Sequence, residues 1–243
     1  MAPFNAYDTR LLRQETTAGM GAQLLLLVLL GTAVGLGLAG WLAGLVFAVV
    51  TWGLLTLALR SWTRAFGPAN CVTLARMTLV GGVTALVANS FEAPPPVPVL
   101  VALTTVALVL DAVDGRVARR TGTASALGAR FDMEVDAVLI LVLSIHVATE
   151  MGVWVLLIGA MRYAFIAAAR ALPWLRGPLP PSMARKTVAA LQGIVLLAVS
   201  AEILPSLVEY AALVLALALL IWSFGRDIGW LWRVAGRHTA VGS

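Results

Sequence analysis

The chain has 243 residues, of which 60% are hydrophobic and only 12% are charged. This composition, with a mean hydropathy of +0.94, excludes an ordinary water-soluble domain and is typical of a protein embedded in a membrane. The net charge of +5 would suit a nucleic-acid partner, but the basic residues are spread over separate segments rather than one stripe, so we expect none.

The first apolar stretch of the chain is long enough for two membrane spans. Residues 16–59 contain no charged side chain, and a helix crosses the hydrocarbon core with about 20 apolar residues. We place the turn between the two spans at Gly35, Gly37 and Gly40. Arg10 precedes the first span as in a signal peptide, but the apolar run is too long for one, so we expect a retained membrane helix.

Further apolar stretches bring the predicted number of spans to eight. They cover about residues 72–90, 97–118, 127–148, 153–172, 187–204 and 207–224. Only helices and closed barrels satisfy the backbone in lipid, and these stretches have the length of helices. The expected fold class is therefore all-α, a polytopic bundle of transmembrane helices.

The basic residues predict the orientation of these spans. The breaks after the odd-numbered spans contain no Lys or Arg, whereas the breaks after the second, fourth and sixth spans and both ends of the chain do. Cytoplasmic loops carry the excess of Lys and Arg in membrane proteins. We therefore expect both termini to be cytoplasmic, and we expect the end of the fourth span to lie near the cytoplasmic face.

Four aspartates lie around the junction of the fourth and fifth spans. Asp111 and Asp114 share one helix face, as do Asp132 and Asp136, because their positions differ by three or four. A break at 121–125 predicts a helical hairpin that brings the two pairs together. Carboxylates near lipid cost about 2.5 to 3.5 kcal/mol each, so we expect bound metal to neutralise them. Hard oxygen ligands without Cys or His favour Mg²⁺, Mn²⁺ or Ca²⁺ over zinc.

The spacing of this motif, D-x-x-D-G-x-x-A-R-x8-G-x3-D-x3-D from Asp111 to Asp136, resembles the signature of the CDP-alcohol phosphotransferase family, also called CDP-alcohol phosphatidyltransferases. Every fixed position of the pattern is filled. The resemblance implies an N-terminal cytoplasmic segment with a two-helix addition at 1–65, a six-helix catalytic core at 66–235 and a cytoplasmic tail at 236–243.

The resemblance also assigns roles to the aspartates. It implies that Asp111, Asp114 and Asp132 bind two divalent cations, Mg²⁺ or Mn²⁺, that hold the pyrophosphate of a CDP-linked donor. Asp136 is implied to be the catalytic base that takes the proton of the acceptor hydroxyl, and it is also expected to touch metal. Its place one helical turn beyond Asp132, on the same face, suits that role.

A second group of residues is expected to bind the nucleotide and its pyrophosphate. Its members are Asn70, Thr73, Arg76, Gly115, Ala118, Arg119 and Gly128. Residues 67–76 resemble the family's P-N-x-x-T-x-x-R entry into the core, with one residue inserted after the proline. Small residues permit close approach of a ligand, and an arginine can pair with phosphate. The alternatives are a helix cap for Asn70 and positive-inside anchors for Arg76 and Arg119.

Basic residues further along the chain are candidates for an acceptor phosphate. They are Arg162, Arg170, Arg185 and Lys186, and membrane topology accounts for them equally well. Arg185-Lys186-Thr187 resembles the K-x-K-T-x-x-Q stretch of relatives that use phosphorylated acceptors. The first Lys is absent and Gln192 is displaced by two positions, so the acceptor assignment stays open.

The function implied by the resemblance is phospholipid synthesis. The chain would transfer a phosphatidyl group from CDP-diacylglycerol to an alcohol and release CMP, with a weak preference for a phosphorylated polyol such as glycerol 3-phosphate or inositol phosphate. The alternatives are transfer of a phospho-alcohol from a CDP-alcohol to a lipid, a cation or proton-coupled transporter, and a lipid-binding subunit without turnover. A homodimer in a bacterial inner membrane is expected.

Overall fold

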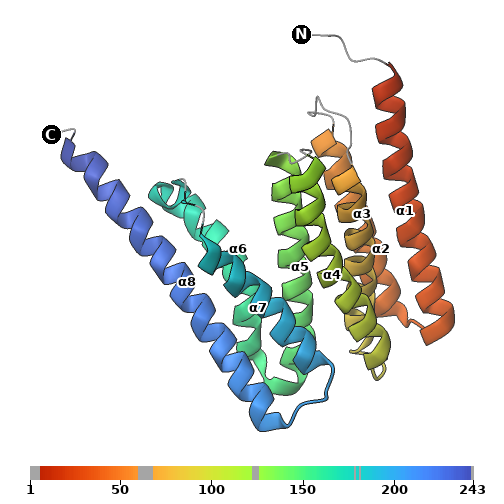
Figure 1. The fold of residues 1–243 in the computed structure, drawn as a ribbon. Helices are drawn as coiled ribbons and strands as arrows, with labels where there is room; N and C mark the ends of the chain where they lie inside the picture. The colour runs from red at the N-terminus through yellow and green to blue at the C-terminus, as the bar shows by residue number, and fades with distance from the viewer. Residues whose placement is uncertain (1–5, 60–67, 122–125, 178, 181, 242–243) are drawn as a thin grey trace. The chain divides into compact units, whose positions relative to one another are not determined.

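The computed structural model describes residues 6–59, 68–121, 126–177, 179–180 and 182–241. In this part of the chain all regular structure is helical (Figure 1). The α-helices are α1 (Ala6–Val34), α2 (Leu38–Leu59), α3 (Pro68–Asn89), α4 (Val97–Thr121), α5 (Ala126–Met151), α6 (Leu156–Ala171), α7 (Met183–Ser200) and α8 (Ser206–Val241). Two short 3-10 helices, η1 (Val153–Val155) and η2 (Pro173–Arg176), flank α6.

Six of the described helices are long and apolar enough to cross a membrane. The qualifying segments are Thr17–Val34, Leu38–Thr56, Val72–Asn89, Val153–Ala171, Met183–Ser200 and Ser206–Ala235. In α4 the apolar part, Val97–Val113, is shorter, and α5 carries Asp132, Glu134 and Asp136 in its first half. The all-α membrane bundle is therefore confirmed. Helices α4 and α5, which contain the acidic motif, are not among the six qualifying helices. Full-length spans at these two helices therefore stay a prediction.

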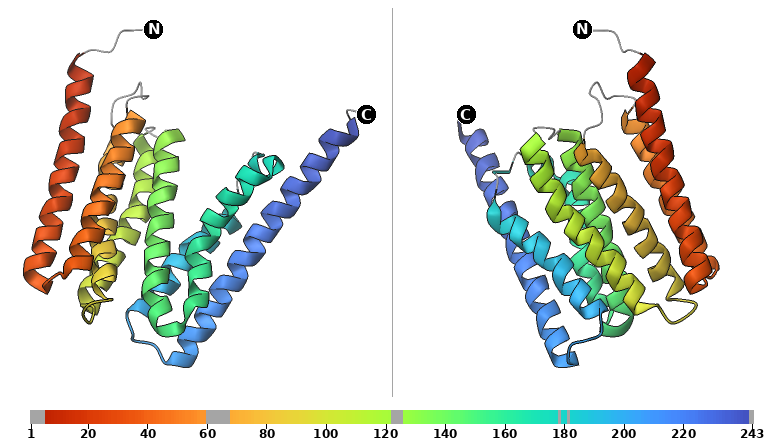
Figure 2. Two further views of the ribbon diagram at one scale, coloured as in Figure 1. Left: turned by 180° about the vertical axis from the view of Figure 1, so that it is seen from behind. Right: turned by 45° about the vertical axis from the view of Figure 1, so that its right-hand side comes forward.

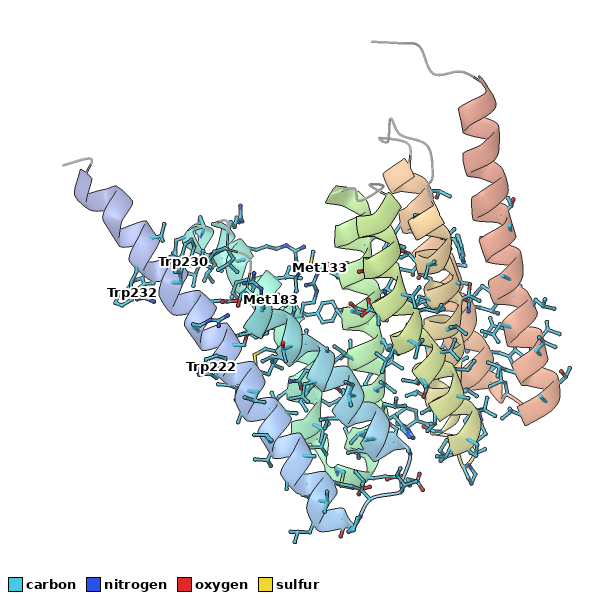
Figure 3. All side chains as sticks on the ribbon, in the orientation of Figure 1. Met133, Met183, Trp222, Trp230 and Trp232 are labelled. Carbon is cyan, nitrogen blue, oxygen red and sulfur yellow. The ribbon has the colours of Figure 1, made fainter. Side chains whose placement is uncertain are left out.

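Helix α8 is longer than the predicted last span. It begins at Ser206 and continues to Val241, past the expected end at residue 224 and through most of the expected tail. Figure 3 shows Trp222, Trp230 and Trp232 along this helix, and the Trp232 side chain is 70% exposed. Apolar and aromatic residues continue after residue 224 beside the charged ones, so nothing in the sequence ends the helix there.

The chain divides into two compact units, residues 1–139 and 140–243. In the first unit, α3 packs against α1, α2 and α4, and these helices run side by side (Figures 1 and 2). The beginning of α3, the end of α4 and the beginning of α5 lie at one end of this unit. The predicted turn between the first two helices is present at residues 35–37, where Gly35 has a φ of 78°.

Glycines allow α1 and α2 to approach α3 closely. A Cβ on Gly81 of α3 would lie 2.2 Å from Nε2 of Gln23, and a Cβ on Gly44 of α2 would lie 2.4 Å from Leu27 and 3.2 Å from Ala85. Small residues at such positions bring helix backbones together and increase van der Waals contact in lipid. The first two helices are therefore packed firmly on α3, which carries one of the site residues described below.

The beginning of α2 is held by Asn89, the last residue of α3, and by Glu92 in the turn that follows it. The backbone N–H of Gly37 donates to Oδ1 of Asn89 at 2.6 Å, and the N–H of Ala39 donates to Oε1 of Glu92 at 2.9 Å. The first N–H groups of a helix have no partner within the helix, so these acceptors satisfy groups that would otherwise be unpaired. Asn89 is buried, which makes its bond hard for water to replace.

We expect Asn89→Ala to lower the free energy of unfolding by about 1 to 2 kcal/mol, because it leaves the Gly37 N–H without its acceptor. Thermal unfolding of the purified protein in detergent measures this loss. Glu92→Gln is the matched control, because it keeps an oxygen acceptor at an exposed position. If the Asn89→Ala protein had the same melting temperature as the Glu92→Gln control, the bond from Gly37 would contribute nothing to stability.

The second unit contains the rest of α5 with α6, α7 and α8. Helices α7 and α8 pack together, and Nε2 of Gln192 donates to the backbone oxygen of Ala216 at 3.0 Å. Gly159 of α6 lies against α5, since a Cβ at this position would be 2.6 Å from Cα of Leu141. Ser182 caps α7 by accepting from the Arg185 N–H at 3.4 Å.

Candidate functional site

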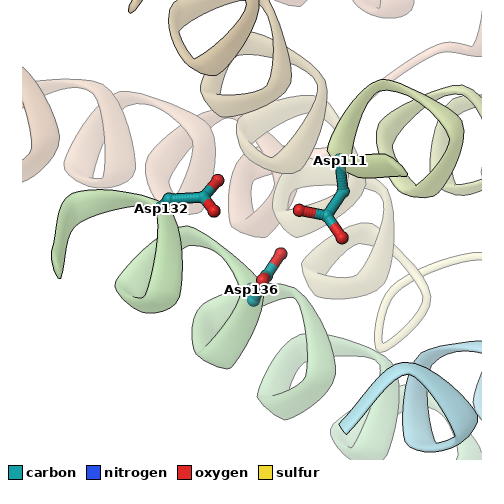
Figure 4. Close-up of side chains that lie close together, drawn as sticks. All are labelled: Asp111, Asp132 and Asp136. Atoms are coloured by element: carbon teal, nitrogen blue, oxygen red, sulfur yellow. The ribbon is translucent and has the colours of Figure 1, made fainter. Parts of the chain in front are cut away.

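Three carboxylates from two helices meet in the first unit. Asp111 lies on α4, and Asp132 and Asp136 lie one turn apart on α5. Figure 4 shows the three carboxylates turned toward one another, and each offers an oxygen within 4.8 Å of the others. The hairpin of α4 and α5 thus brings residues distant in sequence into one group.

Arg76 of α3 binds all three carboxylates. Its Nη1 donates to Oδ1 of Asp111 at 2.8 Å and also to Oδ1 of Asp132, and its Nη2 donates to Oδ1 of Asp136. The Arg76 side chain is fully buried, whereas those of Asp111, Asp132 and Asp136 are 40%, 33% and 36% exposed. The guanidinium therefore lies on the protein side of the carboxylates, which remain accessible from the other side.

Among the described side chains of this group, negative charge is in excess. Arg76 and the three aspartates sum to a formal charge of −2, and partly buried carboxylates are stable only when paired or bound to a cation. Clustered carboxylate oxygens are the donors that Mg²⁺ and Mn²⁺ prefer. The donor set and the spacing of its oxygens fit a divalent cation, and Asp111, Asp132 and Asp136 would hold it.

The fourth predicted metal ligand lies on the same helix as the first. Asp114 follows Asp111 by three residues in α4, so the two positions share a helix face. The side chain of Asp114 lies outside the described residues.

The predicted nucleotide-binding residues fall on the helices that build the site. Thr73 and Arg76 are buried in α3, three residues apart. For the other five predicted residues only the helix is described: Asn70 in α3, Gly115, Ala118 and Arg119 in α4, and Gly128 in α5. The structure thus joins Arg76 to the carboxylates.

A positive side chain accompanies the aspartates, and the motif itself did not predict it. The structure supplies one positive charge from Arg76, which lies 35 residues before Asp111 in the sequence. The signal was present, because an arginine inside an apolar span is costly unless it has a partner. The motif spacing could not reveal it, since the partner comes from another helix.

A second polar group lies in the second unit. Nη1 of Arg185 donates to Oδ2 of Asp227 at 2.9 Å, and Nη2 of Arg226 donates to Oγ of Ser182 at 2.9 Å. A cavity of about 330 Å³ opens beside these side chains. Its described lining consists of Leu179, Pro180, Ser182, Arg226, Asp227, Trp230 and Arg233. The guanidinium of Arg226 also lies 5.1 Å from the ring centre of Trp222. This cation–π contact stabilises the positive charge of Arg226.

The predicted acceptor residues relate to this cavity in different ways. Arg185 donates to Asp227 and to the Pro180 carbonyl, both of which line it. Arg162, Arg170 and Lys186 are not among its described lining residues. Arg226 and Arg233 line the cavity but were not among the predicted acceptor residues. Their charge late in the last apolar helix was a signal in the sequence that could have pointed to them.

A family model matches the part of the chain that carries the acidic motif. The model of CDP-alcohol phosphatidyltransferases matches residues 66–222, which is more than half of the sequence. The matched region contains the complete acidic motif and Arg76, and it leaves α1 and α2 outside. Comparison with curated proteins and with solved structures gives no match.

Proposed function

Because the chain belongs to the CDP-alcohol phosphatidyltransferase family, and is thus a transferase of substituted phosphate groups in phospholipid synthesis, we propose that it transfers a phosphatidyl group from CDP-diacylglycerol to an alcohol and releases CMP. The observation that carries this proposal is the group of Asp111, Asp132 and Asp136 around Arg76. The multi-pass helical bundle suits a lipid substrate, since donor and product both reside in the membrane.

The carboxylates are proposed to bind two divalent cations, Mg²⁺ or Mn²⁺. Asp111, Asp132 and Asp136 supply oxygens within 4.8 Å of one another, and Asp114 follows on the same helix face. When bound, such cations supply the positive charge that phosphate oxygens need as the pyrophosphate is cleaved. The net charge of −2 on the group supports this assignment.

Asp136 is proposed to be the general base. The acceptor hydroxyl gives its proton to the Asp136 carboxylate while its oxygen bonds to the phosphorus that carries the diacylglycerol. The bond from that phosphorus to the bridging oxygen breaks, and CMP leaves with this oxygen. Oδ1 of Asp136 is held by Arg76, and the side chain is 36% exposed. A held but accessible carboxylate can meet a hydroxyl in a defined orientation.

The cavity of the second unit supports an anionic acceptor. Arg185 and Arg226 donate to Asp227, and Arg226, Asp227 and Arg233 line this cavity, so positive charge is in excess among these four side chains. Arginines bind phosphate through paired, charge-assisted hydrogen bonds. We therefore prefer a phosphorylated polyol, with glycerol 3-phosphate and inositol phosphate as the first candidates. Arg162, Arg170 and Lys186 are retained as weaker candidates for the same role.

We place the enzyme in a bacterial inner membrane, as a homodimer, with both termini and the aspartates toward the cytoplasm. The distribution of Lys and Arg supports this orientation. The nucleotide is water-soluble, so a site on that side would have direct access to it.

The test is CMP release by the purified protein in detergent. The protein is incubated with CDP-diacylglycerol, Mg²⁺ or Mn²⁺, and one acceptor at a time: glycerol 3-phosphate, inositol phosphate, serine or a phosphatidyl lipid. CMP formed with one acceptor and lost in EDTA is the expected result. CMP formed only from a CDP-alcohol and diacylglycerol would reverse the direction of loading. Cation or proton flux into vesicles without CMP would identify a transporter instead.

A further inference from the structure

Arg76 has a position that sets it apart from a ligand of the nucleotide. Its side chain is fully buried, and its guanidinium is bonded to one oxygen of each of three carboxylates. In each case that oxygen is Oδ1. The carboxylates are 33% to 40% exposed, so the side away from Arg76 is the side from which a cation or substrate can approach.

Electrostatics gives this arrangement a clear role. Three carboxylates with oxygens within 4.8 Å of one another repel strongly where water is scarce. A guanidinium keeps its charge at every pH at which proteins fold, and its fork of N–H groups can bond several oxygens at once. Arg76 therefore lowers the charge of the group from −3 to −2 even without metal.

The helix that carries Arg76 is held in place by its packing against α1 and α2. Arg76 lies on α3, whose other side is packed against α1 and α2 through Gly81 and Gly44. The bonds from α2 to Asn89 and Glu92 hold the far end of the same helix. A charge carried on a helix packed in this way cannot easily follow the carboxylates if they move.

We infer that Arg76 is a permanent internal counter-cation, which assembles the three carboxylates before metal arrives and, by its charge, keeps the metal loosely bound and exchangeable. It is a positioning residue, since it acts through Asp111, Asp132 and Asp136 rather than on the substrate. The inference rests on the proposed metal-dependent function of the same site. It assigns the arginine a task that a phosphate ligand would not have.

The test compares Arg76→Met with the unchanged protein, in Mn²⁺ and in EDTA. Methionine keeps the apolar length of the side chain and removes the charge. In EDTA we expect the Arg76→Met protein to melt about 10 °C or more below its own value in Mn²⁺, because the guanidinium that bonds all three carboxylates is lost. The unchanged protein should differ by only a few degrees between the two conditions.

The second readout is Mn²⁺ affinity, measured by electron paramagnetic resonance of free Mn²⁺. Loss of a fixed positive charge beside the ligands should tighten Mn²⁺ binding by about tenfold in Arg76→Met. Arg185→Met is the matched control, because it breaks the ion pair with Asp227 in the second unit. It should leave both the Mn²⁺ affinity and the difference between Mn²⁺ and EDTA unchanged.

The outcomes separate this inference from the proposed function. Equal sensitivity to EDTA in Arg76→Met and unchanged protein, or weaker Mn²⁺ binding by the variant, would overturn the inference and leave a metal enzyme. No Mn²⁺ binding by any of these proteins would overturn both. If Arg76→Met does not fold in Mn²⁺, Arg76→Lys replaces it. An ammonium keeps the charge but lacks the fork of N–H groups, so we expect Arg76→Lys to lose an intermediate amount of melting temperature in EDTA. If its melting temperature fell equally in Mn²⁺ and in EDTA, Arg76 would have only a structural role.

Discussion

Replacing Asp136 with asparagine is expected to reduce CMP release by about 10²- to 10⁴-fold, the range over which a general base contributes to catalysis. Asparagine has the shape of aspartate and keeps an oxygen for the bond with Arg76. It cannot take the proton of the acceptor hydroxyl. Binding of CDP-diacylglycerol should therefore remain largely intact while transfer is lost.

This result is measured by two assays on the same preparation, CMP release and retention of labelled CDP-diacylglycerol. Glu134→Gln is a matched control, because it also removes a carboxylate from α5, at an exposed position outside the group around Arg76. It should release CMP at nearly the unchanged rate. Full turnover by Asp136→Asn would remove Asp136 from the role of base and return the question to the other carboxylates.

Replacing Asp111 or Asp132 with asparagine is expected to act earlier, on metal binding itself. Each change removes one charged oxygen that we propose as a metal ligand, and we expect Mn²⁺ affinity to fall by about 10- to 100-fold or more, since even outer partners of metal ligands contribute that much. CMP release should fall with it, but higher Mn²⁺ concentrations should restore part of the activity. Asp136→Asn should not recover in this way, because added Mn²⁺ does not replace the lost base.

The measurement is CMP release as a function of Mn²⁺ concentration, together with direct Mn²⁺ binding. Asp227→Asn provides the control, because it removes a partly buried aspartate of the second unit that also pairs with arginine. Its Mn²⁺ affinity should equal that of the unchanged protein. If Asp111→Asn, Asp132→Asn and Asp136→Asn all kept the same turnover at low Mn²⁺, none of the three would be a ligand or a base.

The helices of this protein follow directly from its sequence, because apolar stretches of about 20 residues can satisfy their own backbone groups in lipid as helices. The turn at Gly35 and the family could also be predicted, because both depend on residues that lie close together in the sequence. The far end of α8 was not predicted, since the predicted span covered only the apolar stretch at about 207–224. Helical structure continues past this stretch to Val241.

The site was only partly predictable. Positions three or four apart indicate a shared helix face, and this is why Asp132 and Asp136 could be grouped in advance. The bonds of Arg76 join residues 35, 56 and 60 positions apart. They depend on how α3 is shifted along its neighbours, which side-chain packing sets. The same is true of Arg226 and Ser182, which are 44 positions apart.

The anchoring of α2 to the end of α3 has a practical consequence for anyone who trims this enzyme. The region shared with the family begins at residue 66, and a shortened version starting there would look like a natural choice. It would strip α3 of the partners of Gly81 and Ala85 and leave Asn89 and Glu92 without the backbone groups they accept from. Such a fragment should extract from membranes poorly and precipitate, even though every motif residue would still be present.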